Sequence, residues 1–304
     1  MSGIKYELNG PTKQINSIAI SNNNEFVACA SADNLIYVWN IVYRKPKLTC
    51  VLHGHTDAVT YVAFLKCNTH VISCSNDNTW RIWDIEYNTQ RQIMCINDTH
   101  VVFTTSRDKT YIALGGRSGT CVVTNIFTAE TSYIENNKGS VLAISISNNN
   151  KHVAVCAFNI DTISTTIYCA KSGKQLYCIS EKIGYDRVNG WKCNIRFSTY
   201  GNHLIMCCGT TYIKVWDFKN GKTSTTTIGA NGNNNIISSV MSRNSKTLFI
   251  NTYTDMIYQY EYKTMTILRT IKNFSDDTCP LVVSPNGKYL LCTGTKNTVC
   301  IRQI

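Results

Sequence analysis

The feature that most constrains the fold is a strand pattern that recurs along the whole chain. Seven apolar alternations each end at an equivalent position, and successive positions lie 41 to 48 residues apart. Alternation with a period of two residues is typical of half-buried β-strands, and a repeat of this length indicates one structural unit per repeat. The seven positions are Trp39, Trp83, Thr124, Tyr168, Trp216, Tyr260 and Arg302.

The clearest copy of the repeat spans residues 53–85. It opens with Gly54-His55, closes with Trp83-Asp84, and carries two apolar runs and the polar turn 76–78 between these ends. Gly-His and Trp-Asp pairs at this separation resemble a WD repeat, which forms one blade of a β-propeller. The resemblance implies four antiparallel strands in each blade, and 304 residues accommodate seven such repeats.

We therefore predict an all-β, seven-bladed β-propeller that occupies residues 1–304 as a single domain. The third strands of the blades are expected to end near residues 40, 84, 125, 169, 217, 261 and 303. The chain ends just after a third strand, so the last blade needs an outer strand from elsewhere. Residues 4–8 alternate and precede Asn9-Gly10, and we expect them to complete the last blade, because closure removes an exposed sheet edge.

In the WD-repeat family the histidine, a Ser or Thr of the second strand, the turn aspartate and the tryptophan form a buried hydrogen-bonded network. The resemblance assigns these structural roles to His55, Ser73, Asp77 and Trp83. A polar group left unsatisfied by an incomplete buried network costs roughly 1–3 kcal/mol. Loss of the whole set from other repeats is therefore compatible with folding, and we interpret His55 as structural, not catalytic or metal-binding.

The first repeat retains part of this set. It keeps Asp33 and Trp39, while Pro11 stands where the histidine is expected.

The composition narrows the class of partner and the compartment. The formal net charge is +11, which favours acidic partners such as RNA or an acidic protein surface. Fifteen cysteines without a C-x-x-C pair, together with no secretory h-region, argue for a reducing compartment rather than a disulfide framework or a zinc site. No apolar run approaches the roughly 18 residues of a membrane span. We expect a cytoplasmic or nuclear protein that does not enter a membrane.

No pattern in the sequence indicates catalysis. It has no nucleophile elbow, phosphate-binding loop or pair of catalytic carboxylates, and the glycine-rich segment 115–119 joins two strands instead of opening a helix. We interpret that segment as a β-turn. The sequence therefore predicts a non-enzyme with no cofactor, no metal and no small-molecule substrate.

Two departures from the regular period identify candidate binding residues. The longest spacing includes the segment 180–192, where Tyr185, Arg187 and Lys192 are residue types that often anchor interfaces. In the family, the loops at this place form the end of the channel that binds peptides. A second insertion, residues 158–163 with Phe158, is expected to lengthen a turn of the fourth blade on the same face. The alternative interpretation of the segment 180–192 is an ordinary variable loop.

Arg117, in the glycine-rich turn, completes the set of partner-binding candidates.

The predicted function is a non-catalytic scaffold or adaptor subunit that binds peptide or protein segments as part of a larger complex. Residues 185–187, with Trp191 and 195–198, are similar to a stretch of the WD-repeat adaptor of Set1-type histone methyltransferase complexes. The length and basic charge are similar to those of the ribosome-bound receptor for activated kinase C, which implies contact with RNA. The nearest basic run for such contact, within 44–47, is interpreted as a solvated loop.

Overall fold

The structure is a computed structural model and describes most of the chain. The described residues are 4–43, 45–95, 98, 102–135, 138–182, 193–198, 201–208, 212–228, 236–244, 246–254, 256–272 and 280–304. Within these ranges the chain forms seven four-stranded antiparallel sheets and no α-helix, with a single 3-10 turn at Thr295–Asn297. The predicted fold class, a β-propeller of seven four-stranded blades, is therefore confirmed. In the described part of the chain no helix could cross a membrane.

The chain divides into two compact units, and the first comprises residues 1–97 and 238–304. Blade one consists of β2 (Ile15–Ile20), β3 (Phe26–Ser31), β4 (Ile36–Asn40) and β5 (Lys47–Leu52). Blade two consists of β6 (Val59–Phe64), β7 (His70–Ser75), β8 (Thr79–Asp84) and β9 (Thr89–Cys95). Blade six consists of β22 (Ile236–Met241), β23 (Thr247–Thr252), β24 (Met256–Glu261) and β25 (Thr266–Lys272). Blade seven consists of β26 (Val282–Val283), β27 (Tyr289–Thr293), β28 (Val299–Gln303) and β1 (Ile4–Leu8).

The second unit, residues 98–237, carries the other three blades. Blade three consists of β10 (Val102–Thr105), β11 (Tyr111–Gly115), β12 (Thr120–Asn125) and β13 (Thr131–Glu135). Blade four consists of β14 (Ser140–Ile146), β15 (His152–Asn159), β16 (Thr162–Cys169) and β17 (Gln175–Lys182). Blade five consists of β18 (Cys193–Phe197), β19 (His203–Cys208), β20 (Tyr212–Asp217) and β21 (Lys222–Thr227).

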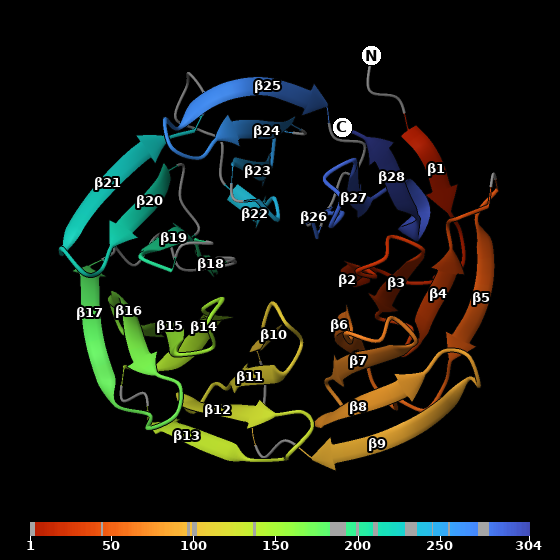
Figure 1. Ribbon diagram of the computed structural model, residues 1–304, viewed down its shortest axis with the longest axis horizontal. Helices are drawn as coiled ribbons and strands as arrows, with labels where there is room; N and C mark the ends of the chain where they lie inside the picture. Colours follow the sequence, from red (N-terminus) through yellow and green to blue (C-terminus); the bar gives the residue numbers. More distant parts are fainter. Residues whose placement is uncertain are drawn as a thin grey trace. The chain divides into compact units, whose positions relative to one another are not determined.

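The N-terminal strand completes the last blade, as the sequence predicts. β1 lies beside β28 (Figure 1) and pairs with it antiparallel, with Leu8 opposite Val299. A side-chain bond strengthens this pairing, because Thr298 Oγ1 donates to Glu7 Oε1 over 2.7 Å. The outer edge of blade seven is thus supplied by residues almost 300 positions away in the sequence, and β28 is not left as an open edge.

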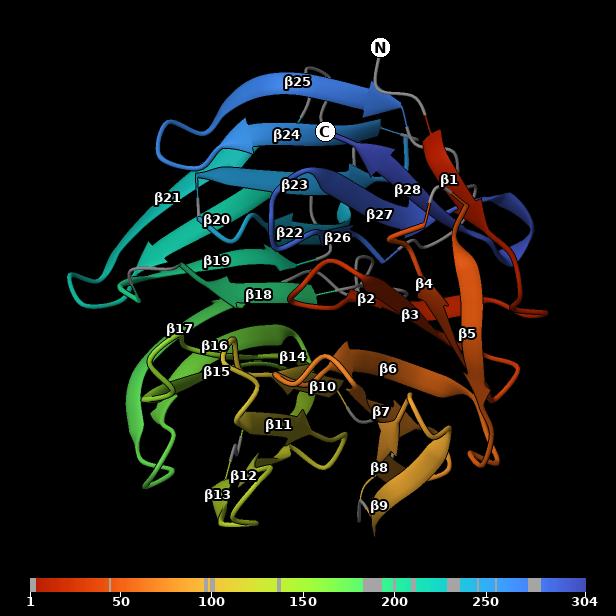
Figure 2. The ribbon, with the colours of Figure 1, turned by 45° about the vertical axis from the view of Figure 1, so that its right-hand side comes forward.

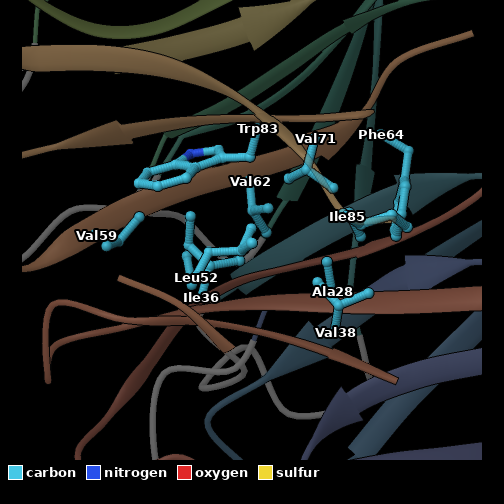
Figure 3. Packing of buried hydrophobic residues seen from close by; sticks show 12 residues of the cluster. Ala28, Ile36, Val38, Leu52, Val59, Val62, Phe64, Val71, Trp83 and Ile85 are labelled. Carbon is cyan, nitrogen blue, oxygen red and sulfur yellow. The ribbon is translucent and has the colours of Figure 1, made fainter. Parts of the chain in front are cut away.

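The repeating position at the third strand is structurally equivalent in all blades. Each of its seven residues pairs with the second residue of its blade's second strand, as Trp83 pairs with Val71 and Arg302 with Leu290. Trp83 lies in a buried cluster with Val62 and Val71 of its own blade and Ala28 of blade one (Figure 3). Burial of a large apolar side chain contributes about 1.5–3 kcal/mol. The position therefore serves packing between neighbouring blades.

This packing role explains which substitutions the position accepts. Tyr168 and Trp216 belong to equivalent buried clusters between blades three and four and between blades four and five. Arg302 is also buried, and its Nη1 donates to the carbonyl oxygen of Lys272 over 2.6 Å. A large side chain is thus retained in blades four and seven although they have lost the Trp-Asp pair, which blade five keeps as Trp216-Asp217.

A second repeated element, which the sequence analysis missed, is the turn between the first and second strands. In six blades a serine hydroxyl accepts a hydrogen bond from the backbone N–H five residues later, over 2.8 to 3.3 Å. The serines are Ser21, Ser106, Ser147, Ser198, Ser242 and Ser284. In five of these turns the serine also donates to an Asn or Asp side chain two residues on. The structure thus gives these Asn and Asp side chains a specific turn function.

Candidate functional site

The four residues of the expected network in blade two come together in a single hydrogen-bonded chain. His55 Nδ1 lies 2.7 Å from Asp77 Oδ2, and His55 Nε2 lies 2.8 Å from Ser73 Oγ. The indole Nε1–H of Trp83 donates to the same Ser73 oxygen over 2.8 Å. The side chain of His55 is only 1% exposed. These contacts link the segment before β6 to β7, to the turn after it and to β8.

The partners of the imidazole assign its tautomer. Ser73 Oγ accepts from Trp83, so its own hydrogen is directed to His55 Nε2, and Nδ1–H donates to the Asp77 carboxylate. A second proton on the ring would have to displace the serine hydrogen. Burial lowers the pKa of His55, and this outweighs the hydrogen bond and charge of Asp77, which act in the opposite direction. The histidine is thus neutral in the folded protein.

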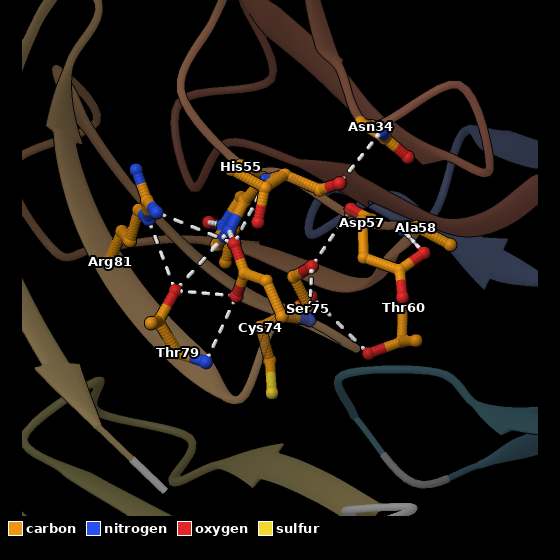
Figure 4. A network of polar contacts seen from close by, with 12 residues as sticks. Asn34, His55, Asp57, Ala58, Thr60, Cys74, Ser75, Thr79 and Arg81 are labelled. Atoms are coloured by element: carbon orange, nitrogen blue, oxygen red, sulfur yellow. Dashed lines mark hydrogen bonds and ion pairs between the residues drawn. The ribbon is translucent and has the colours of Figure 1, made fainter.

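Asp77 is held by several donors besides His55. It accepts from Thr79 Oγ1 over 2.6 Å, from the Thr56 backbone N–H over 3.1 Å and from Arg81 Nη2 over 3.3 Å (Figure 4). Burial alone would raise the pKa of Asp77, but the hydrogen bonds from Thr79, His55 and Thr56 outweigh it and hold the pKa below its ordinary value. The carboxylate therefore stays ionised and fixes the turn between β7 and β8.

The glycine before His55 is required by this geometry. Gly54 has φ +147°, and a Cβ atom there would lie 3.0 Å from Arg81 Nη1 and 3.2 Å from the Trp83 ring. A side chain at position 54 would therefore be strained and crowded against the network.

Blade one satisfies its turn aspartate, Asp33, with different residues. Asp33 accepts hydrogen bonds from Thr12 N–H and Oγ1 and from the Tyr37 hydroxyl, over 2.8 to 3.0 Å. The histidine position holds buried Pro11, and buried Cys29 occupies the second-strand position of Ser73. Burial raises the pKa of the Cys29 thiol, so it remains neutral and apolar. The histidine and serine have been lost together, and Tyr37 supplies the hydrogen bond to the aspartate.

The buried location and complete hydrogen bonding of the blade-two network suit it to a structural role. Both imidazole nitrogens are engaged and the aspartate is occupied by fixed donors, so neither group is available to a substrate. Across the described ranges, with their gaps, no group of three or more His, Cys, Asp or Glu side chains could hold a metal ion.

Arg117 lies exposed in a tight turn of blade three. The turn between β11 and β12 is closed by backbone bonds from Gly116 N to Thr120 O and from Gly119 N to Gly116 O. Asp98 supports it from the preceding loop by accepting from the Ser118 backbone N–H over 3.3 Å and from the hydroxyl of the same residue. A Cβ atom at Gly116 would overlap the Asp98 carboxylate. The glycine therefore allows the close approach that orients this turn.

The insertion around Phe158 does not lengthen a turn, and that expectation was wrong. Residues 158 and 159 extend β15, residues 162 and 163 begin β16, and Phe158 pairs with Ile163 across them. Only Ile160 and Asp161 form the turn, with Ile160 at φ +52°. The inserted residues continue the antiparallel ladder because their backbone groups find partners there. Phe158 itself is half-buried against the cluster between blades four and five, whereas Ile160 is 68% exposed.

The turns that carry Arg117 and Ile160 lie at the same end of neighbouring blades. The Val141 backbone N–H of β14 donates to Gly116 O over 3.1 Å, and the adjacent Ser140 pairs with Phe158. Figure 2 shows β17 at the outer edge of blade four, and its last residue, Lys182, pairs with Thr162. This end of the second unit, here called the turn face, therefore exposes Arg117, Ile160 and Lys182. The candidates Tyr185, Arg187 and Lys192 lie outside the described residues.

One family model, described as WD domain, G-beta repeat, matches residues 3–40 and 46–84. Each match begins at an outer strand and ends at the third strand of the following blade, so the first match spans β1 and the first three strands of blade one. The first two repeats are WD repeats, and the seven-bladed propeller is consistent with the WD-repeat family. A search of curated proteins found no match to this WD-repeat protein. WD-repeat propellers are generally non-catalytic interaction scaffolds, and the match supports such a role in general terms.

Proposed function

We propose that this WD-repeat protein is a non-catalytic scaffold that binds a segment of another protein on the turn face. The observation that carries the proposal is the juxtaposition of exposed Arg117, Ile160 and Lys182 at one end of adjacent blades. Two cations beside an exposed apolar side chain suit an acidic segment that carries one apolar residue. Tyr185, Arg187 and Lys192 follow directly after β17 in the sequence, and we include them as candidate contacts.

The conformation of Ile160 supports a role in contact. A positive φ is unfavourable for a β-branched residue, and exposure of its side chain gives no compensating burial. A glycine would fit the turn better, so the isoleucine side chain is explained by contact with a partner.

The experiment compares affinity-purified complexes from the native cell by quantitative mass spectrometry. We expect that Arg117→Ala with Ile160→Gly, and separately Tyr185→Ala with Arg187→Ala, reduces the main co-purifying protein by about tenfold or more, because anchor residues typically contribute 2 kcal/mol or more. The melting temperature should change little. The matched control is Lys219→Ala with Lys222→Ala, which removes two exposed lysines from the hairpin between β20 and β21. Loss of the partner in the control alone would assign binding to the opposite end of the blades.

We also propose two more specific versions of this scaffold function. The net charge of +11 supports a ribosome- or RNA-associated scaffold, and the similarity of the segment 185–198 supports a chromatin-complex adaptor. Ribosomal proteins and nuclease-sensitive co-purification would favour the first, and methyltransferase subunits would favour the second. We also propose a cytoplasmic or nuclear location, supported by the cysteine content and by the burial of many thiols.

A further inference from the structure

The turn between β6 and β7 departs from the serine-based turn of the other six blades. Leu65 replaces the serine, and Cys67 takes the place held by Asn23, Asn149 or Asn286 elsewhere. In those turns the asparagine side-chain oxygen accepts a backbone N–H two residues later. The Cys67 thiol is exposed and is directed to a different group: its Sγ lies 3.4 Å from Nδ1 of His70. The thiol thus lies beside a base instead of holding the turn.

His70 in turn lies against a carboxylate. It is the first residue of β7 and pairs across the sheet with Asp84, whose Oδ2 lies 3.6 Å from His70 Nε2. A hydrogen bond from Arg91 is the main reason that the pKa of Asp84 lies below its ordinary value, and backbone N–H groups of Tyr87 and Glu86 act in the same direction. Asp84 therefore stays anionic and places a negative charge beside Nε2 of His70.

Different side chains contact the two nitrogens of the His70 imidazole. Thr69 Oγ1 lies 3.1 Å from Nδ1 and shares that nitrogen with the Cys67 thiol. Arg91 Nη2 donates to Asp84 Oδ2 over 2.8 Å, on the Nε2 side. The side chain of His70 is 30% exposed and that of Asp84 is 5% exposed. The base can therefore be reached from solvent, while the carboxylate behind it is buried.

The histidine–aspartate pair alone is a repeated structural feature. In blade five His203 pairs across the sheet with Asp217, and the corresponding nitrogen and oxygen are 3.9 Å apart. The thiol beside the histidine is what distinguishes blade two. Cys178 offers the internal comparison, because it is also exposed but its thiol contacts the hydroxyls of Thr166 and Ser180, which are not bases.

We propose that Cys67 is a nucleophilic thiol, activated by His70, that undergoes exchange with small disulfides of the glutathione type. His70 Nδ1 takes the thiol proton, and the Cys67 thiolate attacks one sulfur of the disulfide. A mixed disulfide forms between Sγ and that sulfur, and the disulfide bond of the reagent breaks. The second sulfur leaves as a thiolate and receives the proton from His70. The protein thiol is oxidised and the reagent disulfide is reduced, so atoms and electrons balance.

Cys67 lies next to a residue that links two neighbouring blades. The neighbouring Asn68 accepts a hydrogen bond from the Asn22 backbone N–H over 2.8 Å and so links the equivalent turns of blades one and two. A bulky anionic group on Cys67 would lie one residue from that link.

The test treats the reduced intact protein with glutathione disulfide at about pH 7 and follows each cysteine by peptide mass spectrometry. We expect Cys67 to form the mixed disulfide at least about tenfold faster than Cys178, a modest gain for a positioned base. His70→Gln should bring the two rates within about threefold of each other. Asp84→Asn should slow Cys67, and Asp84→Glu, which restores the carboxylate, should recover the rate.

Controls separate activation from a change in folding. His203→Gln removes the equivalent pair in blade five and should leave the Cys67 rate unchanged, and melting temperatures show that each variant is folded. If His70→Gln unfolds the protein, Thr69→Val provides the second variant: it frees Nδ1 from a competing hydroxyl and should accelerate the reaction of Cys67. Equal rates for Cys67 and Cys178 in the wild type, or no response of Cys67 to His70→Gln or Thr69→Val, would overturn the proposal.

Discussion

The hydroxyl of Tyr37 donates a hydrogen bond to the carboxylate of Asp33 over 3.0 Å. In blade two the equivalent aspartate receives its bond from His55, which blade one lacks. The tyrosine approaches from the third strand, whereas the histidine approaches from the loop before the first strand. Blade one therefore keeps its turn aspartate satisfied without the histidine that the family pattern expects.

The first prediction tests this replacement. Tyr37→Phe removes one donor from Asp33 and should lower the free energy of unfolding by about 1 kcal/mol, the usual contribution of such a bond. The midpoint of urea denaturation measures the change. Tyr133→Phe is the matched control, because Tyr133 is 74% exposed on β13 and should leave the midpoint unchanged. Equal midpoints for Tyr37→Phe and the wild type would show that the Tyr37–Asp33 bond contributes nothing.

The second prediction concerns the network of blade two. His55→Ala removes the buried acceptor of the Ser73 hydroxyl hydrogen and one donor to Asp77, and should cost on the order of 1–3 kcal/mol. His203→Ala should cost little, because His203 is partly exposed and its distance to Asp217 is 3.9 Å. Chemical denaturation of both variants gives the comparison. Similar losses in the two would mean that the network does not stabilise the blade.

The third prediction is a pH dependence that arises from the lowered pKa of His55. As pH falls below about 6.5, the unfolded chain takes up a proton at this residue and the folded chain does not, so stability should decrease. The contribution of Asp77, whose pKa is also lowered, should be lost only below about pH 4. His55→Asn should flatten the loss of stability between about pH 7 and 5. The slope that remains comes in part from His152, whose pKa is lowered by burial and by Lys219 and Lys151.

Identical pH slopes for the wild type and His55→Asn would contradict the assignment of a neutral buried histidine.

The fourth prediction concerns the N-terminal strand. Deletion of residues 1–9 removes the partner of β28 and exposes that strand as an edge, so we expect a large fall in melting temperature or loss of solubility. Deletion of residues 1–3 leaves the paired strand Ile4–Leu8 in place and serves as the control. A truncated protein lacking residues 1–9 that melts within a degree or two of the intact chain is incompatible with the pairing.

Much of the fold could be predicted from the sequence because strand alternation and the repeat length are local signals. The spacing placed Arg302 at the tryptophan position although the two residues share no chemistry, and the pairing of Arg302 with Leu290 confirms it. Completion of blade seven by residues 4–8 followed from the missing outer strand. These inferences depend on period and on counting strands, and individual substitutions hardly affect them.

Features that depend on side-chain geometry could not be predicted in the same way. The insertion 158–163 was expected to enlarge a turn, because nothing in its sequence indicates that Ile160 adopts a positive φ and allows a two-residue turn. To predict the role of Tyr37, one must know which face of β4 its side chain occupies. The serine turns were visible as a spacing in the sequence, and a search for Ser followed two residues later by Asn or Asp would have found them.

The most direct test of the proposed binding face is hydrogen–deuterium exchange of the WD-repeat protein with and without its purified main partner. We predict that binding slows backbone exchange at 116–119 and 159–162, and that the hairpin 218–222 on the opposite end of blade five exchanges at the same rate in both states. Protection confined to 218–222 and the equivalent hairpins, with 116–119 and 159–162 unchanged, would contradict it.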